Sequence, residues 1–304
     1  MRSYGRDSTC YAPAGSLTAS PETAPRRTLG IIAGRGVLPI RLADTCVAAG
    51  RDVFVLGIEG ETSGEIERFP HAWVSLGSVG SALGALGRAG CGELVLIGPV
   101  SRPDLGRLRL DWEGLKLAPR LALAARRGDD ALLSEVVRYV EERGFRILGV
   151  DDVMSELRAA PGPLGRVRPS PAAEADIRRA DDVVRELGRH DVGQGAVVCD
   201  GLVLAVEAVE GTDAMLRRCA ELPAHMRGAP GARRGVLLKR AKPGQERRVD
   251  LPTIGPHTVE LAAAAGLAGI AVEAGSTLVL DRDEVARLAD ELGLFVVGVA
   301  APSP

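Results

Sequence analysis

The chain has 304 residues, 46% of them hydrophobic, and its 38 basic side chains nearly balance 40 acidic ones, giving a formal net charge of −2. This length and apolar content suffice for one or two buried cores, so we expect two domains. Proteins that bind nucleic acids rely on an excess of positive side chains, which displace counterions from the phosphates. Because the charges here are balanced, we expect no nucleic-acid partner. No apolar run is long enough to span a bilayer, which predicts a soluble protein.

The cysteines and the first residues indicate where the protein works. The five cysteines are scattered, with no C-x-x-C pair and no histidine at zinc-site spacing, so neither disulfides nor a zinc site is indicated. Reduced thiols of this kind predict a cytoplasmic protein. Residues 1–27 are rich in Ser, Pro, Ala and Arg and lack the apolar core of a signal peptide, which predicts a disordered tail.

The first half alternates between strand-like and helix-like segments. Short apolar runs typical of strands buried on both faces occur at 28–34, 52–58 and 93–100, and 145–150 is similar. Helical spacing is found at 38–50, 78–90, 113–127 and 129–143. We therefore predict an α/β fold with an N-terminal Rossmann-like domain of parallel strands over residues 28–158.

The second half has a different pattern. Residues 159–172 contain four prolines and break all periodicity, so we place an interdomain linker there and a C-terminal domain at 173–304. Two hairpins are predicted, one at 196–208 around Asp-Gly and one at 270–280 around Gly-Ser. Helix-like segments lie between them, which predicts a mixed α/β domain.

The glycine turn AGRGVLP joins the first strand to the first helix. Gly34 and Gly36 would direct backbone amides and a helix N-terminus at an anion. The alternative is an ordinary tight turn. Pro39 occupies the position where a dinucleotide fingerprint has a third small residue, which disfavours a nicotinamide-dependent oxidoreductase.

Two helix starts leave structural and functional readings open. In EGTD, Thr212 and Asp213 form either an N-cap with an acidic first turn or a second anion cradle. In GDDALL, Asp129 caps its helix, or the acid pair of Asp129 and Asp130 approaches a metal.

The segment KRAKPGQERRVDLPTIG places one acid within a basic run. Lys239, Lys242 and Arg248 precede or flank Asp250, and a helix N-terminus follows at Gly255. Asp250 in an Asx-turn beside a solvated basic face is one reading. The other is a phosphoanhydride site, in which cations converge on phosphate while the carboxylate stays ionised near a metal or water.

The chain resembles the UDP-2,3-diacylglucosamine pyrophosphatases of lipid A biosynthesis that were first known as a domain of unknown function. The resemblance covers residues 28–299 and depends on several blocks in one order, with a departure at Arg35, where the family usually has glycine. The blocks are LGIIAGRGVLP, GPVSRPDL, ARRGDDALL, HDVGQGAVVCDGLVLAVEAVEGTDAMLRRC, RRVDLPTIGPHTVELAAAAGLAGIAVEAG and LGLFVVG.

The resemblance implies a Mg²⁺-dependent hydrolase that cleaves UDP-2,3-diacylglucosamine at the sugar-side phosphorus into UMP and lipid X, 2,3-diacylglucosamine 1-phosphate. The family's acid for turnover falls on Asp250, which would ligate Mg²⁺ or orient water. The implied partners are substrate, product, a homodimer mate and, transiently, the cytoplasmic face of the inner membrane. The expected substrate-binding residues are Gly34, Gly36, Thr212, Asp213, Lys239, Lys242, Arg248, Thr253 and Gly255.

A non-catalytic protein that binds a sugar nucleotide or lipid phosphate between two closing domains is the alternative. Its composition and strand order would look the same. Turnover in the presence of Mg²⁺ distinguishes the two.

Overall fold

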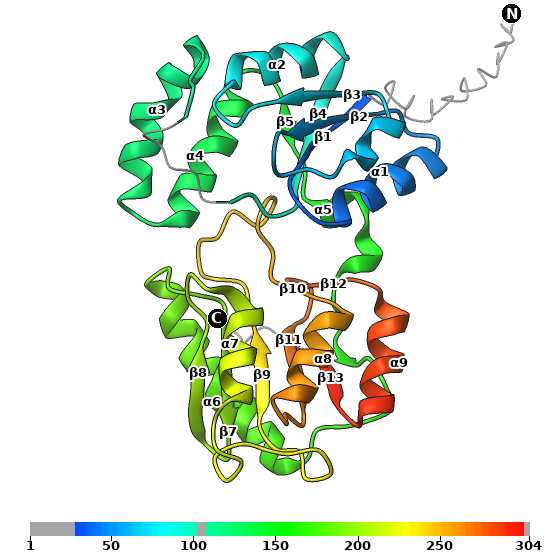
Figure 1. Cartoon of the computed structure of the whole chain (residues 1–304), viewed down its shortest axis with the longest axis vertical. Coiled ribbons are helices and arrows are strands. Elements are labelled where there is room, and N and C mark those ends of the chain that lie inside the picture. The colour runs from blue at the N-terminus through cyan, green and yellow to red at the C-terminus, as the bar shows by residue number, and fades with distance from the viewer. Residues whose placement is uncertain (1–27, 102–107, 301–304) are drawn as a thin grey trace, which may run out of the picture.

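The computed structural model describes residues 28–101 and 108–300, and the predicted tail, residues 1–27, lies outside the described residues. Two α/β units are stacked along the long axis of the molecule (Figure 1). The fold class is as predicted, with a parallel sheet in the first unit and a mixed sheet in the second.

The first unit is built on a five-stranded sheet in the order β3-β2-β1-β4-β5, in which every pairing is parallel. The central strands are apolar on both faces, because helices cover both sides. The strands are β1 (Thr28–Ala33), β2 (Val53–Ile58), β3 (His71–Val74), β4 (Cys91–Ile97) and β5 (Arg146–Ile147). The predicted alternation of strands and helices is confirmed here.

The helices of the first unit form two layers. Side chains of α1 and α5 share one apolar cluster with the sheet, and those of α2 and α4 share another. Helix α3 packs on α4 and α2 and is the outermost helix (Figure 1). The bounds are α1 (Leu38–Ala48), η1 (Gly64–Arg68), α2 (Val79–Arg88), α3 (Trp112–Ala125), α4 (Asp129–Glu141), α5 (Val150–Val153) and η2 (Ser155–Leu157).

The second unit contains a six-stranded mixed sheet in the order β6-β13-β11-β9-β7-β8. Strands β9, β11 and β13 are parallel, whereas β6, β7 and β8 pair antiparallel with their neighbours. The Asp-Gly hairpin is confirmed between β7 and β8, with φ of 50° at Asp200 and 79° at Gly201. The strands are β6 (Gly162–Pro163), β7 (Gly195–Cys199), β8 (Leu202–Val206), β9 (Val236–Lys239), β11 (Gly269–Glu273) and β13 (Phe295–Val299).

Helices cover both faces of this mixed sheet. Helix α6 contributes the apolar side chains on one face, and α7, α8 and α9 contribute those on the other. The bounds are α6 (Pro171–Arg189), α7 (Gly211–Ala220), α8 (Pro256–Ala264) and α9 (Arg282–Leu292).

The second predicted hairpin, at 270–280, is wrong. Strand β11 lies between β9 and β13 in the large sheet, and all five of its residues are buried. The following strand, β12 (Leu278–Val279), pairs instead in parallel with β10 (Thr253–Ile254). The backbone groups of β11 are already hydrogen-bonded to parallel neighbours on both sides. The chain therefore leaves the large sheet at the Gly-Ser turn and does not fold back beside β11.

The two units share packing at the small sheet formed by β10 and β12. Leu278 belongs to the apolar core of the first unit, and Leu251 and Leu280 pack against that core. Arg41 of α1 also pairs with Asp281. Within the stretch predicted as a linker, 159–172, β6 joins the large sheet and α6 begins at Pro171, so the chain is already part of the second unit there.

Candidate active site

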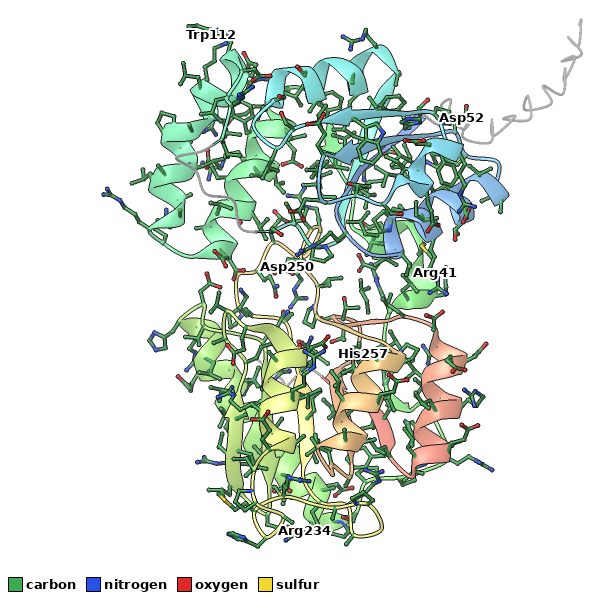
Figure 2. All side chains as sticks on the ribbon, in the orientation of Figure 1. Arg41, Asp52, Trp112, Arg234, Asp250 and His257 are labelled. Atoms are coloured by element: carbon green, nitrogen blue, oxygen red, sulfur yellow. The ribbon has the colours of Figure 1, made fainter. Side chains whose placement is uncertain are left out.

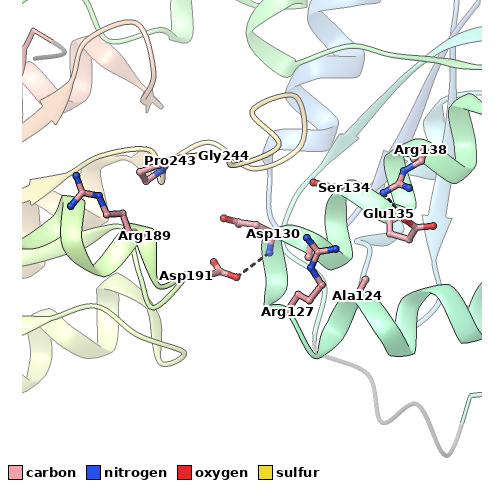
Figure 3. Close-up of a pocket in the computed structure, with 12 residues that line it drawn as sticks. Ala124, Arg127, Asp130, Ser134, Glu135, Arg138, Arg189, Asp191, Pro243 and Gly244 are labelled. Atoms are coloured by element: carbon pink, nitrogen blue, oxygen red, sulfur yellow. Dashed lines mark hydrogen bonds and ion pairs between the residues drawn. The ribbon is translucent and has the colours of Figure 1, made fainter. Parts of the chain in front are cut away.

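An ionic cluster joins the two units. The Lys242 ammonium lies 2.7 Å from Asp130 Oδ1 and 2.5 Å from Asp191 Oδ1. Asp130 is in the first turn of α4, Asp191 lies just after α6 in a left-handed conformation with φ of 52°, and Lys242 follows β9. Figure 3 shows the two aspartates facing each other, with Asp191 Oδ2 accepting the backbone amide of Asp130 at 3.3 Å. Three segments distant in sequence therefore meet at one cation.

Gly128 is required for this approach. Its φ is 115°, and a Cβ built on it would lie 2.0 Å from Asp191 Oδ2. Any larger residue would therefore push Asp191 away from the start of α4. The glycine of the GDDALL segment serves contact between the units, which the sequence did not reveal.

Burial and charge shift the pKa values within this cluster. Burial raises the pKa of Asp130, helped by the nearby charges of Asp191 and Asp250 and opposed by Lys242. Burial also opposes ionisation of Asp191, but hydrogen bonds from Lys242 and from the amide of Asp130 outweigh it and lower its pKa. Burial alone would lower the pKa of Lys242, yet its two carboxylate partners raise it. The ammonium is thus held charged between two acids.

Asp250 lies beside this cluster, between the two units (Figure 2). Its Oδ2 accepts a hydrogen bond of 2.6 Å from Gln245 Nε2. Gln245 Oε1 accepts a hydrogen bond of 2.9 Å from the backbone amide of Lys242, which fixes the orientation of the side-chain amide. Gln194 lies 3.4 Å from the same Nε2. The carboxylate is therefore aimed by a side-chain amide, a different arrangement from the Asx-turn of the alternative reading.

A second polar chain lies at the carboxyl end of β9. Lys239, which is only 4% exposed, donates from Nζ to Thr212 Oγ1 at 2.7 Å and to the carbonyl of Thr253 at 3.1 Å. Thr212 in turn donates to Glu207 Oε1 at 2.9 Å. Three predicted site residues are therefore in direct contact. Thr212 lies within the first turn of α7, whose N-cap is Glu210, so the proposed N-cap role is wrong.

Arg248 is committed to carboxylates of both units. It pairs with Glu246 in its own loop at 2.8 Å and with Glu141 at the end of α4 at 2.6 Å. These partners, the Glu246 hydrogen bond first, raise its pKa. Arg248 therefore acts in this conformation as a tie between the units.

Two backbone amides of the glycine turn after β1 donate to carbonyls of the protein itself. The amide of Gly34 donates to the Ile97 carbonyl and that of Arg35 to the Pro99 carbonyl, at 2.8 and 2.9 Å. A Cβ on Gly34 would lie 2.3 Å from the Gly98 carbonyl oxygen, and Gly36 has φ of 88°, so glycine is needed at both positions. The Arg35 side chain, which stands where the family usually has glycine, forms an ion pair of 3.2 Å with Glu61.

The remaining predicted residues lie at the starts of α7 and α8, which pack together. Asp213 is half-exposed and its carboxylate lies 3.6 Å from His257 Nε2. Gly255 is the N-cap of α8, and its amide donates to Thr258 Oγ1 at 3.3 Å. Both therefore lie at the surface of the second unit that faces the first (Figure 2 labels His257).

A pocket of about 340 Å³ opens beside the Lys242 cluster, between α3 and α4 of the first unit and the end of α6 in the second. Figure 3 shows its charged lining, which combines Asp130, Asp191 and Glu135 with Arg127, Arg138 and Arg189. The apolar residues in the lining have small side chains, namely Ala124, Ala131 and Pro243. The chemistry of this opening suits a charged group better than an acyl chain.

Four residues of the site were not predicted from the sequence: Asp130 as a partner of Lys242, and Asp191, Gln194 and Gln245 altogether. Asp191 and Gln194 belong to HDVGQG, one of the blocks that carried the family resemblance, and Asp130 was considered within GDDALL. No spacing rule could have joined Asp191 to Lys242 or Gln194 to Gln245, because each pair is 51 residues apart. Gln245 lies only five residues from Asp250, but an amide side chain at that spacing carries no signal of its own. In the ranges 28–101 and 108–300, no three His, Cys, Asp or Glu side chains are grouped in a way that could hold a metal ion.

Sequence and structure comparisons place the chain among known proteins. The LpxI N-terminal domain model matches residues 28–157 and the LpxI C-terminal domain model matches residues 160–297. UDP-2,3-diacylglucosamine pyrophosphatase LpxI of Caulobacter vibrioides is 54% identical over 273 residues, covering 90% of this chain and 98% of the relative. The solved structure of CobK precorrin-6A reductase is 12% identical, with a TM-score of 0.32 over 91% of this chain and 88% of its own.

Proposed function

Because the chain belongs to the LpxI family, we propose that it hydrolyses the pyrophosphate of UDP-2,3-diacylglucosamine to UMP and 2,3-diacylglucosamine 1-phosphate, lipid X, in lipid A biosynthesis. The support is a 54% identical relative named for this activity, matched over nearly the whole of both chains. A purely binding protein is disfavoured, because this relative is named for an enzyme activity and the segment around Asp250 lies within the match to the LpxI C-terminal domain, residues 160–297.

We propose Asp250 as the catalytic carboxylate. The observation that carries this assignment is its position between the units, oriented by Gln245 and close enough to Asp130 to raise the pKa of that carboxyl. An oriented, ionised carboxylate can accept a proton from an attacking water. It would serve the transition state more than ground-state binding.

Mg²⁺ is the cofactor that we propose. Mg²⁺ prefers oxygen ligands and is usually bound through one or two protein carboxylates together with substrate phosphates. Asp250 fits that pattern, because Gln245 occupies only one of its two oxygens in the hydrogen bonds of the described chain. When bound, the ion would offset charge on the diphosphate. Asp130 and Asp191 share the Lys242 ammonium as their partner, so we assign them no ligand role.

We propose that polar and cationic residues at the interface between the units bind the substrate. Lys239 and Thr212, at the carboxyl end of β9 and the start of α7, would contact phosphate or sugar oxygens, together with Thr253, Asp213 and Gly255 nearby. Arg248 and Lys242 are occupied by carboxylates, so their part would be to hold the units together around the ligand. Gly34 and Gly36 would shape the facing turn of the first unit.

Location and assembly follow from the substrate. A diacylated sugar nucleotide has its chains in a bilayer, so we propose a cytoplasmic enzyme with transient contact at the cytoplasmic face of the inner membrane. Every helix in the described ranges is too short or too polar to cross a bilayer. Homodimer formation stays a prediction.

The test is turnover by the purified chain. Incubation with UDP-2,3-diacylglucosamine in detergent and Mg²⁺ should release UMP and lipid X, and a chelator should stop the reaction. Asp250→Ala should lower kcat by about a hundredfold or more while substrate affinity is kept. Asp52→Asn, at an exposed loop residue of the first unit, is the matched acid control. Normal turnover by Asp250→Ala would refute the assignment, and no products from the unmodified chain would refute the function.

A further inference from the structure

The outer side of α3 presents apolar side chains to solvent. Trp112 is 71% exposed, Leu115 56% and Leu123 66%. Pro119 and Ala122 are exposed as well, and the spacing of all five places them along one side of the helix. The opposite side is buried through Gly114 and Leu117, so this helix already has its packing partners there. We call Trp112, Leu115, Pro119, Ala122 and Leu123 the α3 stripe.

The exposed charged side chains on α3 and just after it are positive, and one of them, Lys116, pairs with the partly buried Glu113. The other exposed positions of α3 and its C-cap are Lys116 and Arg126, and Arg127 follows. The Lys116 ammonium lies 5.5 Å from the centre of the Trp112 ring. Neither Arg126 nor Arg127 forms an ion pair with any residue in 28–101 or 108–300.

The acids at the start of α3 already have partners. Asp111 caps the helix by accepting the Gly114 amide at 2.8 Å. Glu113 accepts from Tyr139 at 2.7 Å and from Arg143 at 2.6 Å, and its bond with Lys116 is the main cause that lowers its pKa to about 2. The outer side of α3 thus combines exposed apolar groups with the positive charges of Arg126 and Arg127, and anionic surfaces complement it.

The α3 stripe also leads toward the proposed active site. Ala124 and Arg127, at the C-terminal end of the helix, line the pocket that contains Asp130 and Asp191. Figure 2 shows Trp112 at the far end of α3, pointing away from the rest of the molecule. A surface that covered the stripe would therefore reach the edge of the opening between the units.

We propose that the α3 stripe, with Lys116, Arg126 and Arg127, docks on a bilayer that contains anionic lipids. Tryptophan and leucine would enter the headgroup region while the cations contact lipid phosphates, as in interfacial helices. This inference rests on the proposed function, because a substrate with two acyl chains is presented at such a surface. It names the part of the chain that meets the membrane.

Vesicle flotation tests the proposal with the full chain. Vesicles of phosphatidylcholine mixed with phosphatidylglycerol should bind the protein, and added salt should weaken binding. The triple variant Trp112→Ser/Leu115→Ser/Leu123→Ser should lower the vesicle partition coefficient by about tenfold or more. Lys116→Ala/Arg126→Ala should lower it by about fivefold per side chain on these vesicles.

The matched control is Val47→Ser/Leu202→Ser, which removes exposed apolar groups on other faces. It should bind vesicles as the unmodified chain does. All variants should keep turnover of substrate dissolved in detergent, whereas the triple variant should lose turnover of substrate embedded in vesicles. This detergent assay also reports on the proposed function separately, since its failure would leave the flotation result standing.

Equal vesicle binding by the triple variant and the unmodified chain would overturn the proposal, as would no binding by the unmodified chain. Light scattering, which measures the molar mass in solution, tests the alternative that a second copy of the chain covers the stripe. A dimer that the triple variant converts to a monomer, without vesicle binding, would reassign the stripe to self-association. The lysine-arginine variant gives an independent result should the triple variant fold poorly.

Discussion

Replacing Lys242 by methionine should destabilise the fold, because it leaves two carboxylates without their cation. The side chain of Lys242 is 10% exposed, and those of Asp130 and Asp191 are 15% and 19% exposed. Loss of one partner from a fully buried pair costs about 3–5 kcal/mol, and partial exposure reduces the expected loss here to about 2 kcal/mol. Urea unfolding followed by circular dichroism measures this loss as a lower midpoint.

Arg248→Met is the matched control, since it also removes a cation that joins the units. Arg248 and Glu141 are each 37% exposed, so solvent screens the pair and we expect a loss of about 0.5 kcal/mol. Asp130→Asn added to Lys242→Met should recover part of the stability, because it removes one of the uncompensated charges.

The pH dependence has a definite sign. In the unmodified chain the pKa of Asp191 is lowered, so its stabilising contribution is present above its unfolded pKa and is lost as pH falls through the folded pKa. Without Lys242, burial dominates and raises the pKa of both carboxyls in the folded state. Their destabilising effect then disappears as pH falls through those raised values. The stability gap between the two proteins should narrow in acid, and an unchanged midpoint or a gap that widens in acid would refute the reasoning.

Three further outcomes are expected. Gly128→Ala should cost about 2–3 kcal/mol and more than Gly144→Ala, because both have positive φ but only a Cβ at Gly128 meets Asp191; equal urea midpoints would contradict this. Gln245→Leu should lower kcat about tenfold with KM little changed, since it frees the Asp250 carboxylate from its guide, and Gln245→Asn should not restore the rate; an unchanged kcat removes the positioning role. Hydrolysis in water labelled with heavy oxygen should place the label in lipid X, whereas label in UMP would move attack to the uridine-side phosphorus.

The sequence predicted well those elements whose pattern depends on local neighbours. The strands of the first unit are apolar runs, because helices cover both faces of the sheet, and the Asp-Gly turn forces a hairpin through its positive φ values. The failed hairpin at 270–280 has equally good turn residues. Its first strand is buried between parallel neighbours from distant segments, and no local pattern records such partners.

The site was predictable only in part, for the same reason. Asp250, Lys239, Thr212 and Thr253 lie at the interface or beside it, and whether they bind substrate stays a prediction. The cluster of Asp130, Asp191 and Lys242 depends on three segments meeting across two units. The glycine turn illustrates a further limit: its sequence fits an anion cradle or a tight turn, and folding directs the amides of Gly34 and Arg35 to the carbonyls of Ile97 at the end of β4 and of Pro99 just after it.

The packing around β10 and β12 determines whether the two units can be expressed separately or exchanged between relatives. The two family domain models meet between residues 157 and 160, which invites a cut there. Yet Leu251, Leu278 and Leu280, all downstream of that cut, complete the core of the upstream unit. An isolated upstream fragment would expose that core to water, and a chimera of two relatives joined at this point would mismatch it. Engineers who exchange halves should therefore match Leu251, Leu278 and Leu280 to the first half, because α8 and β11 between them belong to the core of the second unit.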